Sequence, residues 1–230
     1  MDTYSGTRDD VDERAANLVA DALSALARKR PSVALGVVGG RSVGGIYRRL
    51  AARDAPWAQV HVFLADERLV PITSEESNYK LVREDLLDAL IASGRLPEGN
   101  AHPFVVDDSR PDAGVAAYGA ELDRAGGRLD VVVLSAGEDG HCASLFPRHP
   151  ALDDPSEHFV LVEGSPKPPP RRVSASRRLL ERAELGAIVF YGAGKADALA
   201  KFRDPAVDLR DCPSKIVPRM ARGVLLTDLA

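Results

Sequence analysis

The sequence predicts a single doubly wound, Rossmann-like α/β domain over residues 1–230, with three layers and a mostly parallel sheet. Strand-like apolar runs alternate with amphipathic, helix-like segments along the whole chain, and this alternation is typical of a parallel sheet with helices on both faces. The most apolar run, residues 129–137, shows no polar alternation. That pattern indicates a strand whose two faces are both covered.

The predicted helices share apolar residues at helical spacing and have polar or proline signals at their ends. Residues 9–30 begin with acids and end with bases, as the helix dipole favours, and Pro31 stops the helix. Ser77 has the chemistry of an N-cap residue. In chain order, the expected helices are residues 9–30, 42–53, 77–92, 111–125 and 195–202.

The predicted strands are short apolar runs bounded by glycine, proline or charged residues. In chain order, they are residues 33–38, 60–67, 102–106, 129–137, 159–164, 171–176 and 185–192. The packing of residues 205–218 is left open, although Pro213 and Ser214 suit the start of a short helix.

Composition limits the classes of function. The net charge of -4 and the lack of a basic run give no general attraction to nucleic acid. The start of the chain lacks the features of a signal peptide, and no apolar run approaches the roughly 18–20 residues of a membrane helix. Cys142 and Cys212 form no CxxC pair or disulfide framework, so we expect a cytoplasmic protein that binds no membrane.

Ligands of doubly wound sheets bind at the carboxyl ends of the strands. The loop GGRSVGG follows the first predicted strand, and Gly39, Gly40, Arg41 and Ser42 offer amides, a guanidinium and a hydroxyl to an anion. The alternative is a tight turn that needs glycine. The loop matches neither the GxGxxG dinucleotide pattern nor the P-loop pattern.

Two further loops carry charged residues at strand ends. Asp66 and Arg68 in ADERLVP suit either a solvated ion pair or an arginine fork for a phosphate or carboxylate. Asp139 and His141 in DGHCASLFP suit a general base and its orienting acid, or else a histidine with a packing role. No second histidine or cysteine lies at a metal-ligand spacing from His141, so we expect no metal. Cys142 fits a small buried thiol better than a nucleophile.

The run PKPPPRR carries Lys167 and Arg172. It suits a polyproline connector or a peptide ligand of another protein. Its place between two predicted strands favours a rigid, cationic rim of the same pocket.

The loops together resemble the 6-phosphogluconolactonases, in the superfamily that they share with glucosamine-6-phosphate deaminase. The matching segments span roughly residues 35–200 and are VVGGRSVGGIYRRL, VHVFLADERLVPITSEESNYKLVREDLL, DVVVLSAGEDGHCASLFPRHP, SPKPPPRRVS and GAGKADAL. Deaminase-type members carry an asparagine–glutamate pair where this chain has Leu145 and Phe146. The chain departs from the family's serine–threonine pair with Arg41 and Ser42, and it has Cys142 where threonine is common.

The resemblance implies a single sugar-phosphate lactonase domain that hydrolyses 6-phospho-D-glucono-1,5-lactone, the second step of the oxidative pentose phosphate pathway. His141 would activate water and Asp139 would orient it. The expected phosphate-binding residues are Gly39, Gly40, Arg41, Ser42, Asp66, Arg68, Lys167 and Arg172. The resemblance implies a sugar-phosphate substrate as the partner, no cofactor and, as the favoured state, a monomer. The alternatives are a deaminase or isomerase of glucosamine 6-phosphate and a non-catalytic sugar-phosphate-binding protein.

Overall fold

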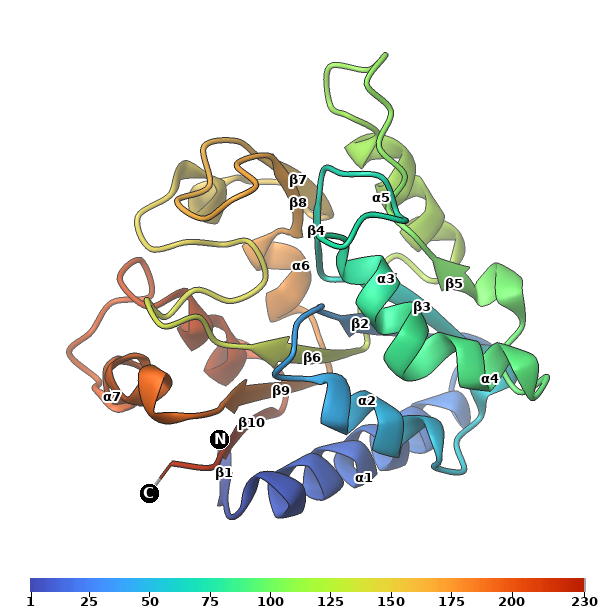
Figure 1. The fold of residues 1–230 in the computed structure, drawn as a ribbon, viewed down its shortest axis with the longest axis horizontal. Coiled ribbons are helices and arrows are strands. Elements are labelled where there is room, and N and C mark those ends of the chain that lie inside the picture. Colours follow the sequence, from blue (N-terminus) through green and yellow to red (C-terminus); the bar gives the residue numbers. More distant parts are fainter. Residues whose placement is uncertain (230) are drawn as a thin grey trace.

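A seven-stranded parallel sheet forms the centre of the computed structural model, which describes residues 1–229 (Figure 1). Every neighbouring pair of strands in this sheet runs parallel. In spatial order the strands are β1 (Asp2–Ser5), β10 (Gly223–Thr227), β9 (Leu185–Phe190), β6 (Val131–Ser135), β2 (Val33–Val37), β3 (Val60–Leu64) and β5 (Ala101–His102). The doubly wound α/β class predicted from the sequence is confirmed.

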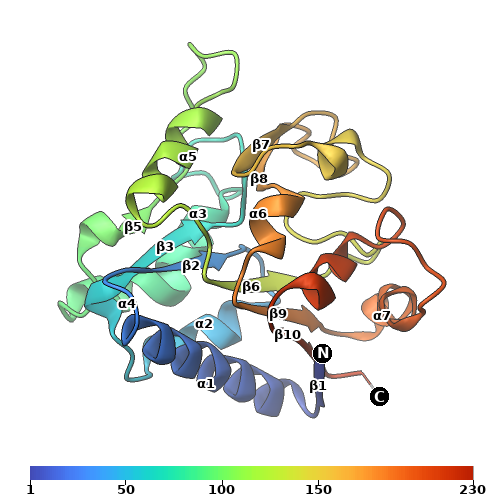
Figure 2. The ribbon, with the colours of Figure 1, turned by 180° about the vertical axis from the view of Figure 1, so that it is seen from behind.

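Helices cover both faces of the sheet. One face carries α1, α2 and the α3–η2–α4 run, and the opposite face carries α5, α6 and η6 (Figures 1 and 2). The α-helices are α1 (Arg8–Ala27), α2 (Gly44–Ala51), α3 (Asn78–Val82), α4 (Asp88–Ala92), α5 (Val115–Arg124), α6 (Arg177–Glu181) and α7 (Ala196–Arg203). A π-helical segment, η2 (Arg83–Leu87), joins α3 to α4. The 3-10 helices are η1 (Trp57–Gln59), η3 (Glu98–Asn100), η4 (Pro150–Asp153), η5 (Ala193–Lys195) and η6 (Pro213–Arg219).

The burial of the central strands follows from this layering. Every residue of β2, β9 and β10 is buried, because each of these strands has neighbours on both sides and helices on both faces. These strands therefore read as continuous apolar runs in the sequence.

The single strand predicted over residues 60–67 is wrong. The chain leaves the parallel sheet after Leu64, and β4 (Asp66–Arg68) pairs antiparallel with β8 (Arg172–Ala175), which in turn pairs with β7 (Phe159–Val162). At the switch, Ala65 donates its amide to Val37 O at 2.6 Å and accepts from Ala175 N at 2.6 Å. Ala65 is thus hydrogen-bonded to both sheets. The chain passes from one sheet to the other without a polar break in the sequence, so the sequence pattern does not reveal the switch.

Other boundaries differ at their ends. The strand predicted over 102–106 contracts to β5, and the helix predicted over 111–125 begins at Val115, after Gly114 at φ 95°. The strands β1 and β10 and the helix α6 were not predicted. Pro213 does begin a short helix, η6, as its chemistry suggested.

Within residues 1–229, no helix is both long enough and apolar enough to cross a membrane.

Candidate active site

A cavity of about 160 Å³ lies at the carboxyl ends of the central strands. Its walls come from the loops after β2, β6 and β9 and from β4 and β8, as the strand order requires. The lining residues are Val38, Gly39, Gly40, Ser42, Asp66, Arg68, Asn78, Ser135, Ala136, Gly137, His141, Ala143, Arg172 and Lys195. Most of the residues expected to form a site therefore do meet at one place.

The loop after β2 approaches α3 very closely. A Cβ built on Gly39 would lie 2.2 Å from the side-chain oxygen of Asn78 and 2.7 Å from its Cα, so no larger residue fits there. Gly40 has φ 114°, a conformation that L-residues with side chains rarely adopt. Both glycines are needed for the turn, and the turn places Gly39, Gly40 and Ser42 on the wall of the cavity.

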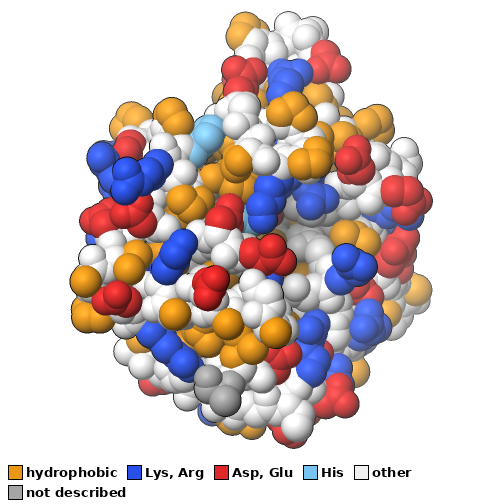
Figure 3. Space-filling view, turned by 60° about the vertical axis from the view of Figure 1, so that its left-hand side comes forward, with side chains coloured by type: hydrophobic (Ala, Val, Ile, Leu, Met, Phe, Trp, Pro, Cys, Tyr) orange, Lys and Arg blue, Asp and Glu red, His pale blue; other side chains and the backbone are white. Residues whose placement is uncertain are grey.

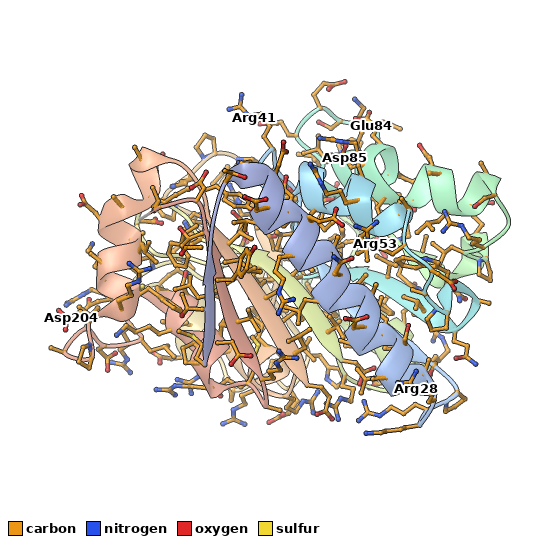
Figure 4. All side chains as sticks on the ribbon, turned by 90° about the horizontal axis from the view of Figure 1, so that it is seen from below. Arg28, Arg41, Arg53, Glu84, Asp85 and Asp204 are labelled. Carbon is orange, nitrogen blue, oxygen red and sulfur yellow. The ribbon has the colours of Figure 1, made fainter. Side chains whose placement is uncertain are left out.

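Arg41, which was expected to bind phosphate, does not line the cavity. Its side chain is exposed and projects outward from the molecule (Figure 4). The turn at Gly40 directs position 41 away from the cavity, while Ser42 lies on its wall. The carbonyl of Arg41 lies 3.4 Å from Nη2 of Arg8 and accepts its hydrogen bond.

His141 and Asp139 form a pair in the loop after β6. Nδ1 of His141 lies 2.5 Å from Oδ1 of Asp139, and the same oxygen accepts the His141 amide at 3.2 Å. A Cβ on Gly137 would lie 2.0 Å from Nδ1, so this glycine makes room for the ring. Because Nδ1 faces the carboxylate, Nε2 is the nitrogen left to accept a proton.

The carboxylate of Asp139 is held in its charged form. Burial acts against that charge, but the hydrogen bond and the positive partner at His141 outweigh it, so the pKa of Asp139 lies well below its usual range. A permanently charged carboxylate fixes the ring orientation and stabilises an imidazolium when one forms.

The segment that carries His141 is anchored from the C-terminal part of the chain. The hydroxyl of Ser214, at the start of η6, lies 2.8 Å from Gly140 O and 3.2 Å from His141 O, and its amide donates to Gly140 O at 2.9 Å. Gly137 N also donates to His141 O at 2.8 Å. The packing of residues 205–218, which the sequence left open, is therefore defined at η6, which packs against the loop of His141.

Cys142 follows His141 but does not share its exposure. Its thiol is fully buried and 3.5 Å from Pro213 O. Burial raises the pKa of the Cys142 thiol far above its ordinary value. A thiolate nucleophile at this position is therefore strongly disfavoured, in agreement with the prediction of a small packing residue.

A buried polar wall faces the histidine. Asp66 accepts from the Ser144 hydroxyl at 2.7 Å and from Nδ2 of Asn78 at 3.2 Å. Nη1 of Arg172 reaches the same hydroxyl at 3.4 Å. Asp66 thus contributes to the site by organising neighbouring donors; as an anion itself, it is poorly suited to contact a phosphate directly.

The two predicted arginines are held differently. Most of the N–H donors of Arg172 bind carbonyls of the proline run. Its Nε donates to Pro169 O at 3.1 Å, and its Nη2 donates to Pro168 O at 2.9 Å. Arg68 donates Nη1 to Glu76 O at 2.6 Å, and its buried Nε has no hydrogen-bond partner within residues 1–229. Arg68 also lines the cavity. Lys167 does not line the cavity, although its charge acts on Asp139.

Among the lining residues that sequence reasoning missed, Asn78 and Lys195 have the side chains best suited to bind a ligand. The side-chain oxygen of Asn78 is buried without a hydrogen-bond partner among the described residues. Lys195 ends η5 directly after β9, and burial lowers the pKa of its ammonium. The signal was available: Lys195 follows the carboxyl end of a predicted central strand, which is the rule that selected the other loops.

The charge of the cavity differs from that of the surface around it. Over the face in Figure 3, acidic and basic side chains are interspersed, with no large area of one sign. In the cavity, by contrast, Arg68, Arg172 and Lys195 converge with Asp66 as the lining carboxylate. This arrangement suits a small anion rather than a polyanion. Within residues 1–229, no cluster of three or more histidine, cysteine or acidic side chains could hold a metal ion.

Comparison with known proteins agrees with this geometry. Residues 6–226 match the model of the family described as glucosamine-6-phosphate isomerases/6-phosphogluconolactonase. The chain is 33% identical over 208 residues to a 6-phosphogluconolactonase of Caulobacter vibrioides, covering 88% of this chain and 87% of that protein. It is 28% identical over 195 residues to that of Borreliella burgdorferi, covering 85% and 83%.

A solved structure extends the likeness to nearly the whole chain. The crystal structure of 6-phosphogluconolactonase from Thermotoga maritima superposes with a TM-score of 0.82 at 25% identity, covering 98% of each chain. The family match spans almost the full sequence, and the fold agrees throughout. The chain therefore belongs to the glucosamine-6-phosphate isomerase/6-phosphogluconolactonase family.

Proposed function

We propose that this protein is a lactonase that hydrolyses 6-phospho-D-glucono-1,5-lactone to 6-phospho-D-gluconate in the pentose phosphate pathway. The observation that carries the proposal is the His141–Asp139 pair, with Nδ1 and Oδ1 at 2.5 Å, whose histidine lines a cavity that three cationic side chains also line. Lactone hydrolysis needs a base for water, and a phosphorylated sugar needs an anion site. Both requirements are met within one cavity, and the relatives named above carry the same activity in their names.

His141 supplies the proton transfers. Water attacks C1 of the lactone as Nε2 removes its proton, and a tetrahedral intermediate forms with the negative charge on the former carbonyl oxygen. The intermediate collapses as the bond from C1 to the ring oxygen breaks, and Nε2 returns the proton to that oxygen. Asp139 keeps Nδ1 engaged throughout, so the proton is exchanged only at Nε2.

The phosphate binds at the opposite side of the cavity. We assign it to the Gly39 and Gly40 amides, the Ser42 hydroxyl and Arg68, with Arg172 and Lys167 adding positive charge. Lys195 contributes a further cation that the sequence did not reveal as a site residue. Because the phosphate is remote from C1, its binding energy orients the lactone for attack. Arg41 is left out of this assignment because its side chain is exposed.

The decisive experiment compares the parent protein with His141→Ala on freshly generated lactone. We expect the variant to lose about 10²- to 10⁴-fold in kcat, the usual contribution of a general base. The readout is acid release above spontaneous hydrolysis. His158→Ala is the matched control, because His158 also pairs with an aspartate, Asp123, but lies outside the cavity. Its rate should equal the parent's, and a near-normal rate for His141→Ala would remove that residue from the mechanism.

Two further assays test the alternatives. Deaminase activity would appear as ammonia released from glucosamine 6-phosphate, and a binding protein would take up 6-phosphogluconate without turnover. Phe146, fully buried and with its ring 4.7 Å from that of His141, occupies the place where the deaminase-type pattern has an acid. That substitution favours the lactonase. The cytoplasmic location, the monomeric state and the single lactonase domain over residues 1–230 stay predictions.

A further inference from the structure

The first residue of α1, Arg8, reaches into the loop that carries Ser42. Its Nη2 donates to the Ser42 carbonyl at 2.7 Å, in a partly buried contact, and to the Arg41 carbonyl at 3.4 Å. Arg8 and Ser42 are far apart in sequence, so this contact exists only in the folded chain. It attaches the N-terminus of α1 to the backbone of the anion-binding turn.

The guanidinium of Arg8 also contacts a residue in the segment that follows β9. It stacks over the ring of Tyr191, 3.7 Å from the ring centroid, directly after β9. Tyr191 is 6% exposed, and its hydroxyl donates to Oδ1 of Asp12 at 2.8 Å. Nε of Arg8 lies 3.5 Å from the same oxygen, as an ion pair without hydrogen-bond geometry. Arg8, Asp12 and Tyr191 form a closed cluster, which we call the Arg8 clasp.

The clasp also contacts the start of α2. Asp12, 3% exposed, lies 3.6 Å from Nη1 of Arg49, and a Cβ on Gly45 would lie 2.0 Å from its Oδ2. Gly45 thus allows the carboxylate to pack directly on the helix that follows Ser42. The clasp therefore fixes the turn on both sides, through the carbonyls of residues 41 and 42 and through the first turn of α2.

The position of Tyr191 gives the clasp a second connection. Tyr191 precedes the segment Gly192–Lys195, and Lys195 lines the cavity. The loops after β2 and β9 lie on either side of β6, whose own loop carries His141. Arg8 links these two outer loops without lining the cavity itself.

We infer that Arg8 is a positioning residue for anion binding, which sets the Gly39–Ser42 turn in its phosphate-binding shape through the carbonyls of Arg41 and Ser42. This inference rests on the proposed function of that turn. A guanidinium has the required geometry, because its planar fork can stack on an aromatic ring while an edge nitrogen donates to backbone oxygens. Without it, the turn keeps its glycines but loses the group that fixes the carbonyls of Arg41 and Ser42.

The test compares Arg8→Ala with Arg14→Ala. Arg14 lies on the same helix, is exposed, and has its guanidinium 5.7 Å from the ring centroid of Tyr4, so it matches Arg8 in residue type and charge without contacting the turn. For Arg8→Ala we expect KM for the phosphorylated lactone to rise about tenfold, the scale of one lost charge-assisted hydrogen bond. We expect kcat to stay within about twofold, because the histidine pair is untouched. Arg14→Ala should match the parent in both constants.

Two further readouts separate positioning from general damage. The inhibition constant of inorganic phosphate should rise by the same factor as KM in Arg8→Ala, whereas turnover of unphosphorylated glucono-1,5-lactone should equal the parent's. Unchanged KM and phosphate inhibition would overturn the inference while leaving the proposed function in place. An equal loss on both lactones would also overturn it, because a loss independent of the phosphate would indicate damage elsewhere.

A second variant covers the case in which Arg8→Ala does not fold. Tyr191→Phe keeps the ring under Arg8 but removes the hydroxyl that holds Asp12, so KM and phosphate inhibition should shift in the same direction by a smaller factor. No shift in a folded Tyr191→Phe would contradict the clasp. If the parent itself does not turn over the lactone, the proposed function fails, and binding of inorganic phosphate by calorimetry replaces KM. Equal affinity of parent and variant in that titration would then overturn the inference alone.

Discussion

Two histidine–aspartate pairs in this protein share their chemistry and differ in their surroundings. His141 lies 2.5 Å from Asp139, and His158 lies 2.8 Å from Asp123. The His141 side chain is 15% exposed and lines a cavity with three cations, whereas the His158 side chain is 36% exposed and its partner 57%. Both histidines have a carboxylate partner, so the proposed role of His141 as a base depends on what its partner does not supply. Restricted access and neighbouring cations are what distinguish it from His158.

Different groups hold the loops that carry the two histidines. Around His141, three contacts from Ser214 and one from Gly137 hold the backbone. Around His158, the Ser156 hydroxyl accepts the His158 amide at 3.1 Å within the same loop, and the distant Ser176 amide donates to the His158 carbonyl at 2.9 Å. Both loops are therefore tied to a distant part of the chain, but of the two histidines it is His141 that lines the cavity. A fixed loop matters for the proposed base, because small displacements of a reacting group are costly.

The largest expected difference between the two pairs comes from neutralising the acid. Asp139→Asn removes the charge that orients His141 and stabilises its protonated form. We expect kcat to fall by at least about tenfold, up to the roughly 10²- to 10⁴-fold contribution of the base itself. Asp123→Asn makes the same change beside His158 and should leave kcat within about twofold. Steady-state rates of both variants on fresh lactone test the comparison, and equal effects would break it.

A smaller effect should follow from removing each loop's serine hydroxyl. In Ser214→Ala, the carbonyls of Gly140 and His141 lose a buried donor, so we expect the free energy of unfolding to fall by about 1 kcal/mol. We also expect kcat to fall a few-fold while KM stays constant, because the displaced group is the base. Ser156→Ala should change neither kinetic constant. Denaturant unfolding and kinetics on both variants give the measurements, and a kcat loss in Ser156→Ala alone would reverse the interpretation.

A third histidine pair sharpens the comparison, because no carboxylate lies between its rings. Nδ1 of His61 is 3.0 Å from Nε2 of His102 at the β3–β5 edge of the sheet, and the His102 ring stacks on Phe63. Burial lowers the pKa of both histidines; for His102, Glu121 opposes the shift, while His61 and Arg124 add to it. If both rings were protonated, the N–H at Nδ1 of His61 and the N–H at Nε2 of His102 would point at each other.

The pH dependence of stability follows from that depressed pKa. The unfolded chain binds protons below about pH 6.5, the ordinary histidine value, whereas the folded pair resists them. This contribution to stability is therefore complete above that pH and is lost progressively as the pH falls toward the folded-state pKa values. His61→Asn, which keeps a donor near Nδ1 but does not titrate, should weaken the decline. Denaturant unfolding between pH 8 and pH 5 measures it, and identical slopes for parent and variant would remove the pair as its source.

The amino-acid sequence alone indicates which chemistry is present and at which end of the sheet it lies. Apolar runs identify β2, β6 and β9, and the rule that ligands bind at the carboxyl ends of strands selects the loops of Gly39, Asp66 and His141. These inferences succeed because period and burial are local properties of a strand and the loop that follows it. The His141–Asp139 pair, two residues apart, is likewise a local feature.

Only the tertiary structure decided which of the candidate side chains face the cavity. Arg41 and Ser42 are adjacent in sequence, yet the first is exposed and the second lines the site. Arg172 was predicted as a phosphate ligand, but the proline run occupies most of its donors. The direction of a side chain depends on backbone dihedrals and on partners far away in the chain, as Arg8, Tyr191 and Ser214 show here. Spacing along the sequence carries no record of such long-range contacts.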